Sequence, residues 1–141
     1  MEDAYDALRL ENQLCFPLYA CSREIIKLYK PHLDGLGLTY TQYITMMVLW
    51  EKGEATAKEL GERLYLDSGT LTPLLKKLEA RGLITRARSK TDERNLMITV
   101  TPEGEALKRQ AVSIPSKMAQ CSRLDENEAA ELYRLLNKLL G

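Results

Sequence analysis

Cysteine, histidine and net charge are all scarce in this chain of 141 residues. It has three cysteines, one histidine and a formal net charge of zero. Cys15, Cys21 and Cys121 are odd in number and far apart, which excludes a framework of structural disulfides and a C-x-x-C zinc site. His32 follows Pro31, and we assign it no ligand or catalytic role. We therefore expect no metal and no cofactor.

Long apolar runs are also missing. No segment approaches the roughly 20 apolar residues that a membrane-spanning helix needs. The acidic start of the chain, with Glu2, Asp3 and Asp6, lacks the basic-then-apolar order of a signal peptide. We expect a cytoplasmic protein with no membrane partner. Hydrophobic residues make up 45% of the chain, which is enough for one compact domain.

The zero net charge conceals an uneven distribution. Between Leu74 and Arg94 there are seven basic and three acidic residues, and the remaining chain carries the matching acidic excess. A local basic patch on a neutral protein can bind phosphates without making the whole surface basic. Charge alone is more typical of a solvated helix face, so the order of the predicted elements decides between the two interpretations.

The middle of the chain predicts a helix-turn-helix. Thr56 is a suitable N-cap for a short helix over 57–64, and a second helix follows a tight turn and ends at Gly82. Proline fits only in the first turn of a helix. Because of Pro73, the second helix should therefore begin between residues 69 and 72, or its start should be distorted.

A β-hairpin with a charged tip is predicted next, over 83–89 and 96–100. A helix-turn-helix followed by a basic hairpin is a winged helix, whose second helix enters the major groove of DNA and whose wing can reach the minor groove. The alternative is a winged helix that contacts proteins. The DNA-contacting residues that we predict are Ser68, Gly69, Thr70, Thr72, Pro73, Lys76, Lys77, Arg86, Arg88, Asp92 and Arg94.

Helices are predicted on both sides of the winged helix. The first runs from about residue 14 to 29 and should end before Pro31, because a proline disfavours helical backbone in the residue before it. The second is capped by Thr39 or Thr41 and ends at Gly53.

Two further helices should follow the wing. One is capped by Thr101 and runs to about Met118 with a bend at Pro115, and a last one begins at a capping box of Asp125 and Glu128. The last helix carries an apolar stripe of Leu132, Leu135, Leu136, Leu139 and Leu140. Within one chain only the first helix can cover it, so we expect these helices to pack with a second copy.

The predicted fold is mainly α with a small β-wing, a winged helix-turn-helix in an obligate homodimer. Residues 36–100 form the DNA-binding lobe, and residues 1–35 and 101–141 form the helical dimerisation lobe, all within one continuous domain. A two-fold dimer presents two recognition helices to a pseudo-palindromic operator in double-stranded DNA.

Four segments in this order are specific. They are residues 10–16, 39–43 and 64–76 and the wing tripeptide Asp92-Glu93-Arg94. With them the whole chain resembles the MarR-type winged-helix regulators, and within that family the organic hydroperoxide-sensing repressors called OhrR.

The resemblance implies a role for Cys15 as the peroxide-reactive thiol. It also implies that the phenols of Tyr29 and Tyr40 from the partner subunit donate hydrogen bonds to that thiol, and Tyr19, one turn further on, can join them. Pro17 independently places the helix start near residue 13 or 14, which leaves Cys15 among the unpaired amides of the first turn. Such surroundings stabilise a thiolate. From the residues alone, a buried and inert cysteine is the favoured interpretation.

The resemblance also concerns Cys121. Some members of the family complete oxidation with a disulfide to a cysteine near the end of the fifth helix of the other subunit, and Cys121 stands at about that place. This implies a sulfenic acid on Cys15 that is resolved by Cys121 of the partner subunit. Other members use small cellular thiols, so a Cys121 without a role is the alternative. For Cys21 we expect a structural role.

The predicted function is a redox-sensing transcriptional repressor. The reduced dimer binds its operator, and an organic hydroperoxide oxidises Cys15, which releases the DNA and derepresses peroxide-resistance genes. One alternative is a MarR-type repressor released by a small phenolic or aromatic ligand. The other, a thiol peroxidase, would need recycling by a reductant, and no C-x-x-C redox pair is present. We expect a regulator and not an enzyme.

Overall fold

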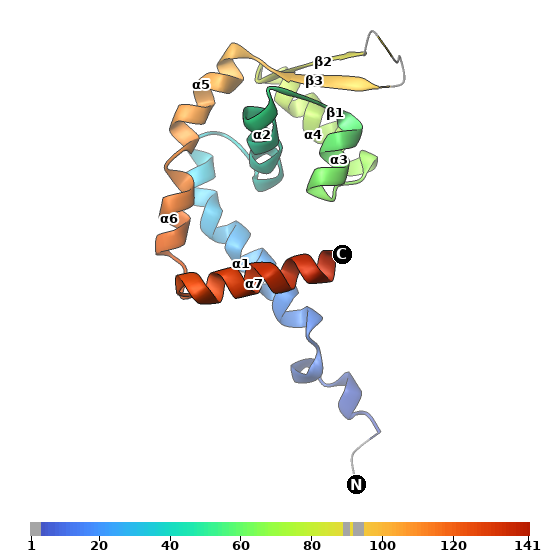
Figure 1. The fold of residues 1–141 in the computed structure, drawn as a ribbon, viewed down its shortest axis with the longest axis vertical. Coiled ribbons are helices and arrows are strands. Elements are labelled where there is room, and N and C mark those ends of the chain that lie inside the picture. Colours follow the sequence, from blue (N-terminus) through green and yellow to red (C-terminus); the bar gives the residue numbers. More distant parts are fainter. Residues whose placement is uncertain (1–3, 89–90, 92–94) are drawn as a thin grey trace.

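The structure, a computed structural model, describes residues 4–88, 91 and 95–141. Its elements in chain order are η1 (Asp6–Leu8), η2 (Leu10–Asn12), α1 (Cys15–Asp34), α2 (Tyr40–Lys52), β1 (Glu54–Thr56), α3 (Ala57–Leu64), α4 (Ser68–Ala80), β2 (Ile84–Arg88), β3 (Leu96–Val100), α5 (Pro102–Ala111), α6 (Ile114–Gln120) and α7 (Glu126–Leu140). Figure 1 shows α2, α3, α4 and the strands gathered in one lobe, from which α1 and α5–α6 lead away.

The three strands form an antiparallel sheet in the order β1-β3-β2. Ile98 in the central strand pairs with Ala55 of β1 on one side and with Arg86 of β2 on the other. The predicted helix-turn-helix with a β-hairpin is therefore confirmed, and β1 is a third strand that the sequence analysis did not predict. Three residues with little alternation give too weak a pattern to identify a strand.

The predicted helix starts are confirmed by their caps. Thr39 and Gln42 form a capping box at α2, and Thr56 accepts a hydrogen bond from the Glu59 amide at α3. Thr101 caps α5 in the same way, with Pro102 at the first helical position, and Asp125 with Glu128 forms a capping box at α7. These motifs are local, so tertiary contacts are not needed to define them.

The predicted end of the first helix is wrong. α1 continues through Pro31 to Asp34. The proline removes only the amide that would bind the carbonyl of Lys27, whereas continuing the helix buries Leu33, which is 2% exposed. A proline inside a helix costs about 3 kcal/mol, and burial of Leu33 with Leu36 and Leu38 of the following turn, at about 1.5–3 kcal/mol for each leucine, offsets that cost.

The predicted range for the start of the recognition helix is also wrong, by one residue. α4 begins at Ser68 because the side chain of Asp67 accepts a hydrogen bond from the Thr70 amide and fixes the start there. Pro73 consequently lies inside the helix. After the wing, the predicted bend at Pro115 appears as a break between Ala111 and Ile114, just before the proline.

The hydrophobic core lies in the winged-helix lobe. Its most deeply buried side chains are Met46, Leu49, Leu60, Leu75, Leu78, Ile84 and Ile98. Helix α5 is attached to this core through Trp50, whose indole Nε1 donates a hydrogen bond of 2.8 Å to the carbonyl oxygen of Gly104. The core thus extends from α2 into the segment that leads to α6.

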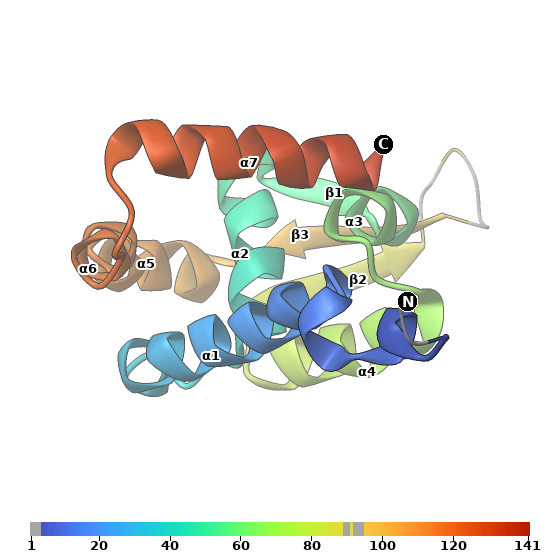
Figure 2. The same ribbon diagram turned by 90° about the horizontal axis from the view of Figure 1, so that it is seen from below.

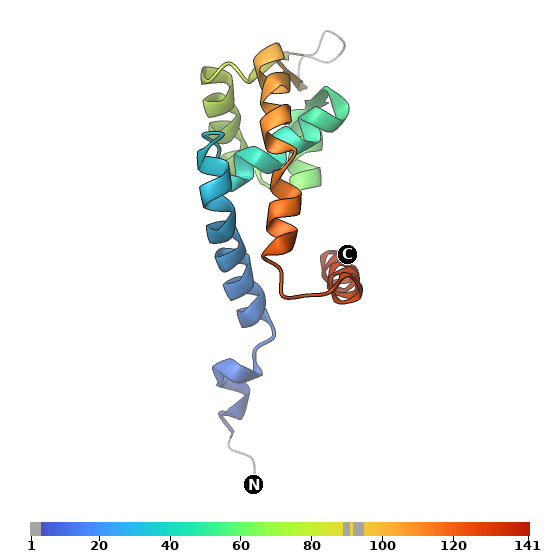
Figure 3. The same cartoon turned by 90° about the vertical axis from the view of Figure 1, so that its left-hand side faces the viewer.

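The outer helices leave their apolar faces uncovered in the single chain. No residue of α7 is buried, and Figures 2 and 3 show α7 standing apart from α1. The exposed apolar side chains of the two helices include Phe16, Ile25, Ile26, Leu28, Leu132, Leu135, Leu139 and Leu140. Exposed apolar surface of this extent marks an interaction surface. In the described residues no helix is long and apolar enough to cross a membrane.

Substitution of Gly104 by alanine tests the packing of α5 against the winged-helix lobe. A Cβ at this position would overlap the carbonyl oxygen of Leu83 and lie 2.7 Å from Cγ2 of Val100. We expect Gly104→Ala to lower the free energy of unfolding by about 1–3 kcal/mol in urea denaturation at fixed protein concentration. Gly69→Ala is the matched control, because its Cβ meets only the Asp67 carboxylate at 3.4 Å. A change in the control as large as that of Gly104→Ala would contradict the prediction.

Candidate functional site

Cys15 is the first residue of α1. The residue before it, Leu14, provides no side-chain cap, and Pro17 in the first turn has no amide hydrogen. The thiol is free and exposed. The predicted position in the first turn is confirmed. A side chain in this position lies beside the partial positive charge of the helix N-terminus and is accessible to a small oxidant.

Tyr19 lies one helical turn beyond Cys15. Its phenol oxygen accepts a hydrogen bond of 2.9 Å from the Arg23 guanidinium, whose central carbon also lies 5.5 Å from the centre of the tyrosine ring. A phenol oxygen can accept one hydrogen bond while its O–H group donates another to a second partner. Tyr19 can therefore act as a donor next to the first turn of α1.

Three tyrosines form a cluster at the other end of α1. The ring centres of Tyr29 and Tyr40 are 5.0 Å apart, and those of Tyr29 and Tyr43 are 5.8 Å apart. Burial raises the pKa of Tyr29, and the neighbouring Tyr40 raises it further. Burial also raises the pKa of Tyr43, followed by the effects of Tyr29 and Tyr40. Tyr29 and Tyr43 therefore remain protonated donors at neutral pH.

The tyrosine cluster cannot reach Cys15 within one chain. Cys15 and Tyr29 belong to the same helix and are separated by about 21 Å along its axis. No side chain spans that distance. A hydrogen bond between a cluster phenol and the thiol would therefore have to join two different chains.

The other two cysteines are exposed as well. Cys121 lies at the C-cap of α6, where its amide donates a hydrogen bond of 3.1 Å to the carbonyl of Met118. Cys21 lies on α1, and its exposure gives no support to the structural role that we expected. All three thiols are free in the single chain.

The recognition helix α4 presents a polar outer face. Its inner face is buried in the core through Leu71, Leu74, Leu75 and Leu78. The predicted DNA-contacting residues on this helix are all exposed: Ser68, Gly69, Thr70, Thr72, Pro73, Lys76 and Lys77. Asp67, the residue directly before α4, is its N-cap. An Asp directly before the apolar pattern was the signal for it.

The wing residues are arranged differently from each other. Arg86 is only 21% exposed and its guanidinium binds Glu79 at 2.9 Å, which lowers the pKa of that carboxyl. The structure thus uses Arg86 to join β2 to α4. Arg88 is exposed at the end of β2. Two further predicted contacts, Asp92 and Arg94, lie outside the described residues.

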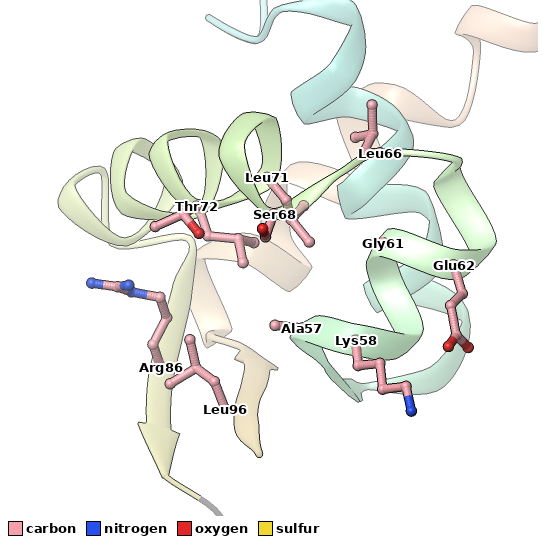
Figure 4. Close-up of a pocket in the computed structure, with 11 residues that line it drawn as sticks. Ala57, Lys58, Gly61, Glu62, Leu66, Ser68, Leu71, Thr72, Arg86 and Leu96 are labelled. Atoms are coloured by element: carbon pink, nitrogen blue, oxygen red, sulfur yellow. The ribbon is translucent and has the colours of Figure 1, made fainter. Parts of the chain in front are cut away.

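A cavity of about 480 Å³ lies between α3 on one side and α4 and the wing strands on the other. Leu66, Leu71 and Leu96 are among its lining residues, and Figure 4 shows Lys58 and Glu62 pointing away from it. No group of His, Cys, Asp or Glu side chains that could hold a metal ion occurs within the described ranges.

Comparisons with known proteins agree with this architecture. The family model "Transcriptional regulator SarA/Rot" matches residues 27–111. An organic hydroperoxide resistance transcriptional regulator of Bacillus subtilis is 51% identical over 140 residues, which is 99% of this chain and 95% of that protein.

Solved structures show the same similarity. AbfR of Staphylococcus epidermidis in its reduced form bound to DNA has a TM-score of 0.80 at 35% identity, with 95% of this chain and 92% of that chain covered. The disulfide form of AbfR has a TM-score of 0.61 at 36% identity, over 95% and 89% of the two chains. A mutant of MarR from E. coli complexed with operator DNA shares the fold, with a TM-score of 0.85 at 23% identity over 99% and 100%.

The winged helix with its exposed recognition helix defines the chain as a DNA-binding transcriptional regulator, and its relatives are regulators rather than enzymes. The chain belongs to the MarR/SarA family, in the group of the organic hydroperoxide regulators. The resemblance inferred from the four sequence segments is confirmed.

Spectroscopic titration tests the tyrosine cluster. We expect tyrosine absorbance to show a late phase of ionisation above the ordinary pKa of 10.0, because the pKa values of Tyr29 and Tyr43 are raised. Tyr29→Phe and Tyr43→Phe should each remove part of this late phase, and unfolding in concentrated urea should remove all of it. A raised pKa in the folded state stabilises the protein below the unfolded pKa, and this contribution is lost as the pH rises through the folded value. A late phase that survives both substitutions would contradict the assignment.

Proposed function

We propose that the chain is a redox-sensing repressor whose reduced homodimer binds a pseudo-palindromic operator and whose oxidation by organic hydroperoxides releases the DNA. The observation that carries this proposal is the exposed thiol of Cys15 at the first turn of α1, in a chain that also exposes a recognition helix. Derepression of peroxide-resistance genes follows from release. The name of the Bacillus relative supports organic hydroperoxides as the signal. The reduced, DNA-bound AbfR structure supports the reduced form as the one that binds DNA.

The exposed apolar faces of α1 and α7 support the homodimer. Helices with wide apolar faces are stable in water when another surface covers them. A second copy also resolves the separation of Cys15 from the tyrosine cluster, because the cluster of one chain can meet the thiol of the other. The dimerisation lobe is then formed by residues 1–35 and 101–141, and the DNA-binding lobe by residues 36–100.

The chemistry begins with the thiolate of Cys15. Its sulfur attacks the terminal oxygen of the hydroperoxide, a sulfur–oxygen bond forms and the oxygen–oxygen bond breaks. The product is a sulfenic acid, and the alkoxide that leaves takes a proton from water and becomes an alcohol. Donors for the thiolate are Tyr19 of the same chain and, across the dimer, Tyr29 and Tyr40 of the partner subunit. Cys121 of the partner subunit then attacks the sulfenic sulfur, and a disulfide forms with loss of water.

Release of DNA is mechanical in this proposal. The phenol contacts change and the disulfide forms at the dimer interface, which shifts the helices that set the spacing of the two recognition helices. Half-sites lie about 34 Å apart for one turn of DNA, or a multiple of it, so a change in spacing breaks the match. Only the difference in free energy between the two states can drive release.

Substitution of Lys76 tests the DNA face. Lys76→Ala removes one exposed positive charge per subunit from the outer face of α4. We expect weaker binding to any duplex and a slope of log affinity against log salt that is smaller by about two for the dimer, measured by fluorescence anisotropy. Lys138→Ala on α7 removes the same charge far from α4 and should leave the slope unchanged. Equal slopes for Lys76→Ala and wild type would contradict the proposal that Lys76 on the outer face of α4 contacts DNA phosphates.

Substitution of the cysteines tests the sensor. Cys15→Ser should bind duplex DNA like the wild type and ignore cumene hydroperoxide in a mobility-shift assay, while Cys21→Ser, on the same helix, should still respond. Loss of DNA binding by reduced Cys15→Ser would show that Cys15 has a structural role.

After peroxide treatment, non-reducing electrophoresis should show a cross-linked dimer that is missing in Cys121→Ser. A cross-link that survives this substitution would refute the resolving role of Cys121.

A second candidate function is a repressor released by a small phenolic or aromatic ligand. A cavity of about 290 Å³ lies between α2 and the α5–α6 segment and is lined in part by Tyr43, Trp50 and Lys108. Aromatic walls suit an aromatic ligand, and Glu51 and Lys108 place one charge of each sign in the lining. Release of DNA from Cys15→Ser by salicylate-like compounds would favour this candidate over the redox sensor.

A further inference from the structure

Arg81 connects the end of the recognition helix to a distant part of the chain. It is the C-cap residue of α4. Its Nη2 donates a hydrogen bond of 3.0 Å to the carbonyl of Leu36, and its Nη1 donates one to the carbonyl of Gly37. Both acceptors belong to the turn between α1 and α2. In Figure 3 the light-blue end of α1 and this turn lie next to the yellow-green helix α4.

The turn is shaped to receive the guanidinium. Gly37 has a φ of +67°, in the left-handed region that favours glycine. A Cβ at this position would lie 3.2–3.3 Å from three atoms of the Arg81 guanidinium, which is a closer approach than most side chains allow. Glycine therefore serves both the backbone conformation and the space for Arg81.

The same turn is firmly joined to α1. The amides of Leu36 and Leu38 both donate to the carbonyl of Leu33, at 2.9 and 3.2 Å, and the amide of Gly37 donates to the carbonyl of Asp34 at 3.1 Å. Leu33, Leu36 and Leu38 are all buried. The two carbonyls that Arg81 binds must therefore move together with the C-terminal end of α1.

Helix α1 links this end to Cys15. It has 20 residues, so its axis is about 30 Å long. The absent amide of Pro31 removes one helical hydrogen bond, but the helix continues to Asp34 and the turn. A tilt of α1 at its first residue therefore displaces the carbonyls at its far end. An arginine fork fixes orientation as well as distance, because its donors lie in one plane.

We propose that Arg81 is the positioning residue that couples α1 to the recognition helix, so that oxidation at Cys15 reaches the DNA face through its two hydrogen bonds. This inference rests on the proposed redox function and names the residue through which that function acts. Arg81 touches neither the peroxide nor the thiol. It holds the C-terminal end of α4 against the turn, while the other end of α4 carries the exposed residues from Ser68 to Pro73.

The test compares the Kd for one duplex in the reduced and the peroxide-oxidised protein. Wild type should show a large ratio of oxidised to reduced Kd, and Arg81→Met should reduce that ratio at least about fivefold, the lower end of typical coupling between sites. Arg81→Lys, which keeps the charge without the fork, should be intermediate. Arg63→Met is the control, because it removes an ion pair to Glu51 in the same lobe that does not involve α1 or α4. Its ratio should equal that of wild type.

Gly37→Ala attacks the same contact from the other side. It should reduce the ratio as Arg81→Met does, and the double variant should be no worse than the stronger single variant, because both changes break one contact. This variant and Arg81→Lys keep the test decisive if Arg81→Met does not fold. Thermal unfolding of each variant identifies loss of fold.

The outcomes are distinct. If wild type does not release DNA on oxidation, the redox function fails and the coupling fails with it. If wild type releases DNA and the Arg81 and Gly37 variants keep the full ratio, only the coupling is overturned. A variant that loses stability and binds more weakly in both states by the same factor shows a purely structural role, which also overturns the inference.

Discussion

Burial of helix α2 is the packing constraint on which the other elements depend. Met46 and Leu49 are fully buried, and α2 contacts α1, α3, α4, α5 and two of the strands. Tyr43 near its start belongs to the tyrosine cluster, and Trp50 near its end binds the Gly104 carbonyl. Because α2 is buried and makes contacts at both of its ends, it fixes the positions of the tyrosine cluster, the recognition helix and α5 relative to one another.

A single chain does not bring the parts of the candidate sensor together. The two parts of the candidate sensor lie at opposite ends of α1, about 21 Å apart along the helix axis. The apolar faces of α1 and α7 are both exposed in the single chain. Separation of the parts and exposure of the faces have one explanation in the proposed dimer, since a second copy covers the faces and supplies the phenols.

Motifs that act over three or four residues could be predicted from the sequence, while features that depend on distant contacts could not. The caps at Thr39, Thr101 and Asp125 were predicted because a side chain and a nearby amide suffice. The end of α1 was missed because burial of Leu33 and of the leucines in the following turn outweighs the proline. Arg86 counted as one positive charge of a basic segment, and only folding showed that Glu79 binds it.

Periodicity, caps and the order of elements were enough to define a winged helix, and the position of Pro17 was enough to place Cys15 in a first turn. These features are local, and a chain carries them in any conformation it can adopt. Tertiary structure alone decided that Tyr29 lies against Tyr40, and that Arg81 reaches the turn at Leu36 and Gly37. Those contacts join residues more than ten positions apart, and their geometry exists only after the core around α2 has formed.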